Sequence, residues 1–147
     1  MDRKEFLRTG CITCIGMALG ASLLQSCAAG GKYVKGTLNG RGLLVNLSDF
    51  ETGKTGMRPY LIVRHDAIEF PLCVYHIEGD TFTALLMRCT HQGAELQAAG
   101  DQLTCQAHGS EFDRYGTATQ GPATLPLRSF PVSVANGQVF IDLRKQS

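Results

Sequence analysis

The sequence predicts an all-β domain built of antiparallel hairpins, and three observations support this fold class. Short apolar runs recur between Gly, Asn and Asp turn signals from residue 33 to the end of the chain. Several of these runs alternate apolar and polar residues, as strands with one buried face do. No stretch beyond residue 27 keeps a helical apolar period over three turns. With 147 residues, 44% of them hydrophobic, the chain is long enough for one such domain with its own core.

Eight strands are expected, and recognisable turns separate some of them. The predicted strands are Tyr33–Leu38, Leu43–Leu47, Tyr60–His65, Leu72–Ile77, Phe82–Met87, Leu103–Cys105, Phe130–Val134 and Val139–Leu143. Asn136-Gly137, between the last two strands, favours a hairpin with a primed turn, because both residues tolerate positive φ. Gly79-Asp80 predicts a second turn, and Leu38-Asn39-Gly40-Arg41-Gly42 gives a third.

Residues 1–26 differ from the rest of the chain and have the character of an export signal. Three basic side chains, Arg3, Lys4 and Arg8, precede 14 uncharged residues at 11–24. This run is shorter than the roughly 20 residues of a membrane-spanning helix and is typical of the apolar region of a signal peptide. The basic segment also resembles a twin-arginine export motif, with Lys4 in the place of the second arginine.

The segment ends in Leu24-Gln25-Ser26-Cys27, which resembles the lipobox of bacterial lipoproteins. The resemblance implies that Cys27 is joined to diacylglycerol and becomes the mature N-terminus, so that acyl chains hold the protein on a membrane. We therefore expect a signal peptide at 1–26, a lipidated tether at 27–31 and the folded domain at 32–147, on the periplasmic face of a bacterial membrane. A plain secretory signal and a short membrane anchor are the alternatives.

Charge and cysteine content narrow the function classes. Three of the 14 basic and two of the 13 acidic residues lie in 1–26, which leaves 11 of each sign after it. A nucleic-acid binder would show a basic excess, so we do not expect this class. Four cysteines remain, too few and too unevenly placed for a secreted disulfide framework. Cys73 lies among apolar residues and is expected to be a buried filler, so Cys89 and Cys105 need another explanation.

Two short motifs each offer one cysteine and one histidine. The first is Cys89-Thr90-His91-Gln92-Gly93-Ala94. The second is Cys105-Gln106-Ala107-His108-Gly109-Ser110, and 13 residues separate its cysteine from His91. A Gly100-Asp101 turn between them predicts a hairpin that brings the two loops side by side. Two thiols and two imidazoles would then converge at one tip of a β scaffold.

Two kinds of metal site suit these four ligands. One zinc ion would take all four in a tetrahedron, whereas a [2Fe–2S] cluster would take the thiolates on one iron and the imidazoles on the other. Gly93 and Gly109 favour the cluster, because glycine lets the backbone approach it closely and aim N–H groups at its sulfides. Ser110 adds a hydroxyl donor after the second histidine, which a structural zinc site has less use for.

These motifs resemble those of the Rieske iron–sulfur proteins. The resemblance lies in Cys-Thr-His-Gln-Gly at 89–93, in Cys-x-x-His-Gly-Ser-x-Phe-Asp at 105–113 and in Gly121-Pro122-Ala123, and it covers about residues 60–144. It implies antiparallel sheets with a small cluster-binding subdomain, and one [2Fe–2S] cluster. By position, Cys89 and Cys105 would bind one iron and His91 and His108 the outer one, and Pro122 would lie in the loop that covers the cluster from a third side.

Three positions depart from the quinol-oxidising members of that family. Those proteins join the two loops by a disulfide, whose positions are Ala94 and Ala107 here, and they carry a Tyr where this chain has Phe112. Their Tyr hydroxyl donates to a cysteine sulfur, which Phe112 cannot do, whereas Ser110 still can. Because each donor to a sulfur stabilises the reduced state, we expect a reduction potential below that of the quinol-oxidising members, within a range for this ligation of about −150 to +300 mV.

The predicted function is one-electron transfer through the cluster. The protein would be a carrier or the small subunit of a periplasmic oxidoreductase, and its redox protein partners would dock at the exposed edge formed by His91 and His108. No Gly-x-Ser-x-Gly and no nucleotide-binding glycine motif is present, so a stand-alone catalyst is not expected. The alternative is a structural zinc-binding lipoprotein without a redox role.

Overall fold

The structure is a computed structural model that describes residues 31–53 and 55–144. In this part the chain forms 15 strands and one 3₁₀ helix, η2 (Leu47–Phe50). The predicted signal peptide and Cys27 lie outside the described residues. None of the helical structure within the described ranges has the length and apolar character needed to cross a membrane.

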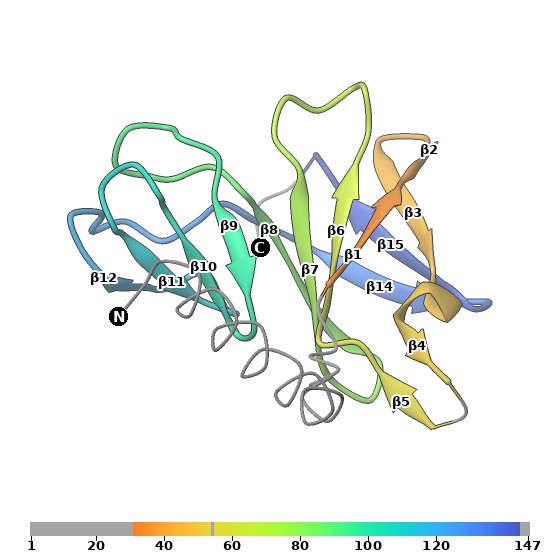
Figure 1. Ribbon diagram of the computed structural model, residues 1–147. Helices are drawn as coiled ribbons and strands as arrows, with labels where there is room; N and C mark the ends of the chain where they lie inside the picture. Colours follow the sequence, from red (N-terminus) through yellow and green to blue (C-terminus); the bar gives the residue numbers. More distant parts are fainter. Residues whose placement is uncertain (1–30, 54, 145–147) are drawn as a thin grey trace, which may run out of the picture.

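A five-stranded sheet forms the centre of the domain (Figure 1). Its strands, in spatial order, are β1 (Lys32–Lys35), β6 (Tyr60–Arg64), β7 (Leu72–Glu78), β8 (Thr81–Leu86) and β13 (Ser129–Phe130). β1 runs parallel to β6, whereas the other three pairs are antiparallel. The all-β prediction is confirmed, with one parallel edge that arises because a long connection separates β1 from β6.

Smaller sheets lie at the two ends of the central one (Figure 1). One end carries β2 (Thr37–Asn39), β3 (Gly42–Asn46), β14 (Val132–Ala135) and β15 (Gln138–Asp142). Their spatial order is β14-β15-β3-β2. The short hairpin of β4 (Glu51–Thr52) and β5 (Gly56–Met57) lies near them. The other end carries β9 (Gln97–Ala99), β10 (Gln102–Thr104), β11 (Glu111–Asp113) and β12 (Ala118–Gln120), paired in chain order. We call β9 to β12 and their loops the cluster subdomain.

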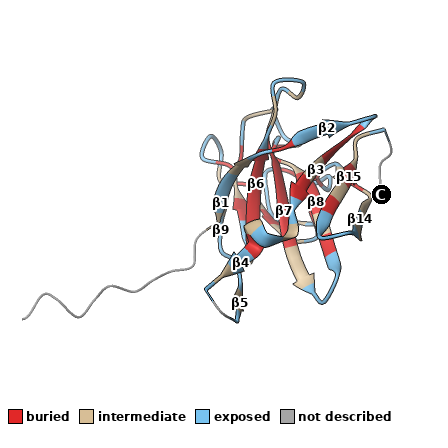
Figure 2. Cartoon of the chain, turned by 90° about the vertical axis from the view of Figure 1, so that its right-hand side faces the viewer, coloured by how far each residue is buried: buried red, intermediate tan, exposed pale blue. Residues whose placement is uncertain are grey.

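Strands β6 and β7 of the central sheet are buried on both faces, as their red segments in Figure 2 show, whereas the edge strand β1 is mostly exposed. Alternation along β6 divides the core in two, because Tyr60 and Ile62 pack in one hydrophobic cluster and Leu61 and Val63 in another. The first cluster also contains Cys89, Cys105 and other residues of the cluster subdomain. The second contains residues of β3 and β15. Burial on both faces explains why β6 and β7 are apolar almost without interruption.

Two predicted strands are each divided between two sheets. Tyr33–Leu38 changes sheet at Gly36, between β1 and β2, and Phe130–Val134 changes sheet at Pro131, between β13 and β14. Gly36 is buried, and a Cβ there would lie only 3.0 Å from the Val63 side chain. Pro131 has no N–H to give to a ladder, which suits a point where pairing changes. The apolar pattern showed both runs but could not show the change of sheet.

The predicted turns are confirmed. Asn136 and Gly137 have φ of 52° and 71° between β14 and β15, as a primed turn requires. Gly79-Asp80 joins β7 to β8, and the turn at 40–41 joins β2 to β3. Gly100-Asp101 joins β9 to β10, so the hairpin expected between the two motifs is present. β4, β5, β11 and β12 were not predicted, because strands of two or three residues carry too little periodicity.

Candidate metal centre

Two loops of the cluster subdomain carry the four predicted ligands. The first loop, residues 89–94, leads from β8 towards β9, and the second loop, residues 105–110, connects β10 to β11. Strand-like pairing closes the base of each, between Arg88 and Glu95 in one and between Thr104 and Glu111 in the other. The two loops therefore start from equivalent positions in their hairpins.

The two loops share one pattern of backbone hydrogen bonds. In the first, Cys89 N–H donates to Ala94 O at 2.8 Å and Gly93 N–H donates to Cys89 O at 2.9 Å. In the second, Cys105 N–H donates to Ser110 O at 2.8 Å and Gly109 N–H donates to Cys105 O at 2.8 Å. Gly93 and Gly109 have φ of 78° and 81°, in the region that favours glycine. Each loop is thus a tight turn whose shape depends on its glycine.

The same bonds show how the N–H groups of the two loop glycines are used. Gly93 N–H and Gly109 N–H both donate inside their own loops, so any backbone donor aimed at a sulfide belongs to another loop residue. Their role in this structure is to close the loops, because a backbone N–H that already donates to a carbonyl offers no second hydrogen.

The four side chains separate into a buried pair and an exposed pair. Cys89 and Cys105 are only 2% and 1% exposed, and both are free thiols in the first hydrophobic cluster. His91 and His108 are exposed, and their ring centroids lie 5.0 Å apart with the rings perpendicular. The predicted arrangement of sulfur inside and nitrogen at the surface therefore appears when the two loops come together.

Residues 120–127, here called the proline segment, lie against both loops. Gln120 Nε2 donates to Gly109 O at 3.0 Å, and Ala123 N–H donates to Ser110 Oγ at 3.0 Å. Thr90 Oγ1 donates to Leu125 O at 2.7 Å. Pro122, after a cis peptide bond, is exposed between these contacts. The proline segment therefore bonds to both loops, and Pro122 lies within it.

The roles of Thr90, Gln120 and Leu125 were not predicted from the sequence. Thr90 and Gln120 stand next to motif residues, which is a weak signal for a supporting contact. Their partners are 35 and 11 residues away along the chain. Only folding brings these groups within hydrogen-bond distance.

Ser110 and Phe112 lie behind the loops with no exposed surface. Because the Ser110 oxygen accepts from Ala123, its hydroxyl hydrogen is left to donate elsewhere. Phe112 packs in the hydrophobic cluster that contains both ligand cysteines. Ala94 and Ala107, which take the places of the disulfide that the resemblance implies for other members, are not buried. The site is thus held by packing and by the proline segment.

A third cysteine lies in the same core. Cys73 is fully buried, as predicted for an apolar filler, and burial raises the pKa of its thiol to about 12, an effect partly offset by the Tyr75 hydroxyl. Burial also raises the pKa of Tyr75. Apart from this weak contact with a thiol, the Tyr75 hydroxyl has no hydrogen-bond partner in the described part of the chain. Cys73 is therefore protonated at neutral pH, and it lies in β7, outside the two loops that carry the predicted ligands.

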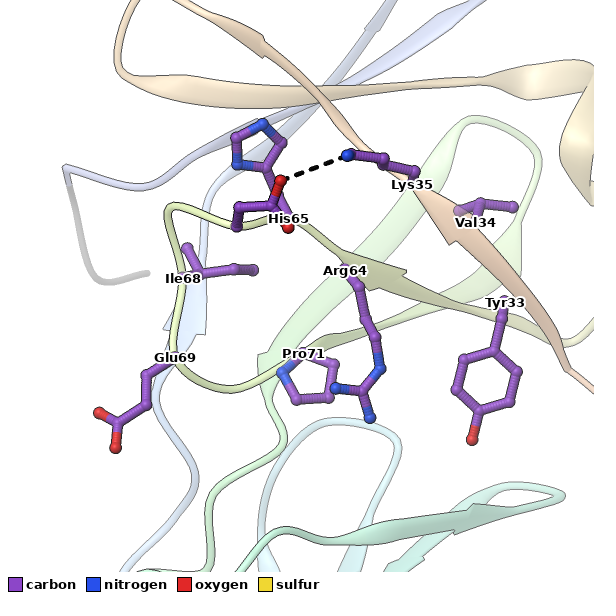
Figure 3. Close-up of a pocket in the computed structure, with 9 residues that line it drawn as sticks. Tyr33, Val34, Lys35, Arg64, His65, Ile68, Glu69 and Pro71 are labelled. Carbon is purple, nitrogen blue, oxygen red and sulfur yellow. Dashed lines mark hydrogen bonds and ion pairs between the residues drawn. The ribbon is translucent and has the colours of Figure 1, made fainter.

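A hollow of about 460 Å³ elsewhere on the surface contains none of the four ligands. It lies between β1 and the loop after β6, and it is lined by Tyr33, Val34, Lys35, Arg64, His65, Asp66, Ile68, Glu69 and Pro71 (Figure 3). Lys35 forms an ion pair with Asp66 in this hollow. Arg64, which also lines it, forms an ion pair with Glu95 at 2.6 Å. The hollow adjoins the first loop through this ion pair but is separate from the metal centre.

The donor set suits an iron–sulfur cluster better than one ion. A tetrahedral zinc ion would draw four donors onto one centre, whereas a [2Fe–2S] cluster takes two donors on each of two irons. The buried thiol pair, the exposed imidazole pair and the Ser110 hydroxyl fit the second case. The fold and this donor set define the class as a β-sheet iron–sulfur domain.

Comparison with known proteins identifies the family. The profile of the Rieske [2Fe-2S] domain matches residues 44–131, more than half of the chain. The chain belongs to the Rieske [2Fe-2S] family, and its domain carries one [2Fe–2S] cluster. The predicted resemblance to the Rieske proteins is therefore confirmed, with the match at residues 44–131, and the zinc alternative is not supported.

Two curated relatives and one solved structure illustrate the likeness. Ferredoxin CarAc of Metapseudomonas resinovorans is 39% identical over 75 residues, or 48% of this chain and 69% of the relative. The cytochrome b6-f complex iron-sulfur subunit of Chlorobaculum tepidum is 30% identical over 67 residues, or 44% of this chain and 37% of the subunit. The structure of Sphingomonas yanoikuyae B1 ferredoxin has a TM-score of 0.50 and 27% identity over 67% of this chain and 94% of that chain. The match thus spans most of the ferredoxins but little more than a third of the b6-f subunit.

Proposed function

We propose that Cys89 and Cys105 bind one iron of the cluster, that His91 and His108 bind the other, and that the protein passes single electrons between redox partners. The observation that carries this proposal is the meeting of two equivalent loops, which bury two thiols and hold two imidazole rings 5.0 Å apart at the surface. Bound in this way, the cluster supplies a one-electron redox centre.

The surrounding residues of the chain determine the solvent access and the hydrogen bonding of that centre. The buried thiols lie in an apolar core, which excludes water from the sulfur side. The exposed imidazoles leave a short path from the metal to the surface. Ser110 provides a hydroxyl donor to the sulfur side, and the proline segment shields it. Electron exchange at the imidazole edge is therefore the arrangement that this geometry favours.

The cellular setting rests on the N-terminal residues. Leu24-Gln25-Ser26-Cys27 supports lipidation of Cys27 after removal of residues 1–26, with residues 27–31 as a tether and 32–147 as the Rieske domain on the periplasmic face of the membrane. Similarity to an iron–sulfur subunit of a membrane complex is compatible with this location.

Two kinds of partner suit such a protein. Similarity to ferredoxins supports a carrier, and similarity to the b6-f subunit supports a small subunit of a periplasmic oxidoreductase. Ala94, Ala107 and Phe112 stand where the quinol-oxidising members have the disulfide and the Tyr, which favours a carrier of lower potential.

The ligand set is tested by electron paramagnetic resonance of the reduced protein, together with iron and sulfide analysis. We expect two irons and two sulfides per chain and a signal that Cys89→Ala, Cys105→Ala, His91→Ala and His108→Ala each abolish or alter. Cys73→Ala and His65→Gln are matched controls outside the loops, and they should keep the wild-type signal. A wild-type signal in any of the four ligand variants would exclude that residue as a ligand, and bound zinc without iron would support the structural alternative.

The anchor is tested separately by mass spectrometry and fractionation. Wild-type protein should gain a lipid mass on Cys27 and sediment with membranes, and Cys27→Ala should lose both properties. Cys14→Ala, a cysteine within the predicted signal peptide, is the control and should behave as wild type. Membrane association that survives Cys27→Ala would point to a retained N-terminal anchor instead.

A further inference from the structure

A groove of about 500 Å³ runs beside the first loop. Cys89, Thr90, His91, Gln92 and Gly93 form one wall. The rest is lined by Leu86, Arg88, Leu125 and Arg128, which come from the end of β8, the proline segment and the approach to β13. One of the two exposed imidazoles therefore opens directly onto a hollow, which suits contact with a second molecule.

The groove carries two cations that no acid neutralises. Within the described ranges, neither Arg88 nor Arg128 forms an ion pair. Their guanidinium groups lie over aromatic rings instead, at 5.6 Å from the Phe70 centroid and 4.8 Å from the Phe130 centroid. A cation–π contact fixes a guanidinium without cancelling its charge. Arginine held in this way is well suited to bind carboxylates in a bidentate manner.

The nearest acid on the first loop does not offset these charges. Glu95 follows the loop directly, but its carboxylate is paired with Arg64 at 2.6 Å. The second loop, by contrast, has no Lys or Arg between Cys105 and Asp113, and Glu111, Asp113 and Arg114 follow it. The two cations that line the groove, Arg88 and Arg128, therefore lie on the His91 side of the site.

The groove also offers a fixed apolar surface. Leu125 is 65% exposed, and its carbonyl accepts the Thr90 hydroxyl at 2.7 Å. The Arg88 guanidinium packs over Gly93, where a Cβ would lie 3.1 Å from Nε. Exposed apolar surface ringed by arginine is typical of protein interfaces.

We propose that this groove is the docking site of a redox protein that presents carboxylates around its own redox centre, and that electrons pass through His91 rather than His108. The inference rests on the proposed function. It adds the chemistry of the partner surface and the histidine through which the electron passes. The carboxylates would pair with Arg88 and Arg128, and Leu125 would supply the apolar contact. One electron crosses at the His91 edge, and no bond forms or breaks.

The kinetic test uses two small oxidants of opposite charge. Reduced protein is mixed with ferricyanide, an anion, or with tris(phenanthroline)cobalt(III), a cation, and the second-order rate of cluster oxidation is followed by stopped flow. Because the folded part has equal numbers of acidic and basic residues, net charge by itself gives little salt dependence. We expect the ferricyanide rate to fall with salt and the cobalt rate to rise.

Substitutions of single arginines test which charges cause this salt dependence. Arg88→Gln and Arg128→Gln should each lower the ferricyanide rate by about threefold or more at about 10 mM salt. Both differences should vanish near about 1 M salt, where the screening length is about 3 Å. Arg41→Gln, which removes one cation from the turn between β2 and β3 at the far end of the domain (Figure 1), is the control and should leave the rate unchanged. The midpoint potential of each variant is measured as well, so that an altered driving force is recognised.

A binding measurement separates docking from electron transfer. Hexacyanocobaltate(III), a redox-inert anion shaped like ferricyanide, is titrated into the protein and followed by calorimetry. Wild type and Arg41→Gln should bind it equally, and Arg88→Gln and Arg128→Gln should bind more weakly. If the wild type transfers electrons but neither rate nor binding responds to Arg88 and Arg128, the docking proposal is wrong and the proposed function stands. If no cluster signal is found, the proposed function fails whatever the anion binding shows.

A competition experiment distinguishes a protein partner from a membrane surface. Poly-L-glutamate should compete with hexacyanocobaltate for the groove of the wild-type protein and not for that of Arg128→Gln. Vesicles of phosphatidylglycerol should compete no better than neutral phosphatidylcholine vesicles. Competition by the phosphatidylglycerol vesicles alone would assign the groove to anionic lipid and overturn the proposal.

Discussion

The Ser110 oxygen accepts the backbone N–H of Ala123 at 3.0 Å, in a contact with no exposed surface on the serine. This bond joins the second loop to the proline segment. It also leaves the serine hydroxyl hydrogen available to donate, because an oxygen that accepts from one side can donate on another. One residue therefore both anchors the proline segment and offers a hydrogen-bond donor to the proposed cluster.

Ser110→Ala should lower the midpoint potential. It removes a donor that stabilises the reduced state, and a hydrogen bond of roughly 1 kcal/mol corresponds to roughly 40 mV for one electron. It should also destabilise the fold by about 1–3 kcal/mol, because the buried Ala123 N–H loses its acceptor. Protein-film voltammetry and thermal unfolding measure the two effects. Ser133→Ala, at an exposed position in β14, is the control, and a Ser110→Ala protein with unchanged potential would remove this account of tuning.

Phe112→Tyr should raise the midpoint potential by roughly 20–60 mV. Phe112 is fully buried in the same cluster as Cys89 and Cys105, so an added hydroxyl has sulfur as an available acceptor. Phe140→Tyr, on β15 in the other end sheet, is the control and should leave the potential unchanged. A Phe112→Tyr protein that is destabilised without any change in potential would mean that the hydroxyl reaches no sulfur.

Gly93→Ala should destabilise the protein more than Gly109→Ala. Both residues have positive φ, so either change costs about 1–2 kcal/mol in backbone strain. At Gly93 the new methyl group would also lie 3.1 Å from Arg88 Nε, whereas a Cβ at Gly109 meets nothing within 4 Å. Thermal unfolding of the cluster-bound proteins measures the difference. Adding Arg88→Ala should narrow the gap between the two variants, and a gap of the opposite sign would contradict the contact.

The stability of the protein should fall at alkaline pH, in part because of Cys73. Burial raises the pKa of this thiol from 9.0 to about 12, so the unfolded chain loses the proton first. The stability that the neutral thiol contributes is full below about pH 9 and is lost as the pH rises towards 12, by at most about 1.4 kcal/mol per pH unit. Cys73→Ala should therefore show a smaller drop in melting temperature between about pH 9 and 11 than the wild type. An equal drop in both proteins would show that Cys73 does not cause it.

Tyr75→Phe should raise the melting temperature. The Tyr75 hydroxyl is buried with only a thiol contact, and leaving such a group without a good partner costs about 1–3 kcal/mol. Removing the oxygen keeps the ring and its packing against Tyr60, at a centroid distance of 5.5 Å. Tyr60→Phe is the opposite control, because it removes a bond from the Tyr60 hydroxyl to Ala98 O and should destabilise. A lower melting temperature for Tyr75→Phe would reveal a partner for this hydroxyl.

The candidate ligands were predictable because their signal is local. A cysteine and a histidine two or three residues apart, followed by a glycine, form a pattern that needs no knowledge of the rest of the chain. The Asn136-Gly137 turn was predictable for the same reason. The strands of the central sheet were predicted because apolar runs are readable in one dimension, although their division at Gly36 and Pro131 was not.

The sequence by itself determined the candidate metal ligands and the β scaffold, since both predictions depend on residues close together in the chain. Only the tertiary structure decided what surrounds these ligands. It placed Leu125 against Thr90 and Ala123 against Ser110, and it left Arg88 and Arg128 without an acid beside His91. These contacts join segments up to 35 residues apart. Their formation depends on how two hydrophobic cores bring the sheets together, which local spacing does not encode.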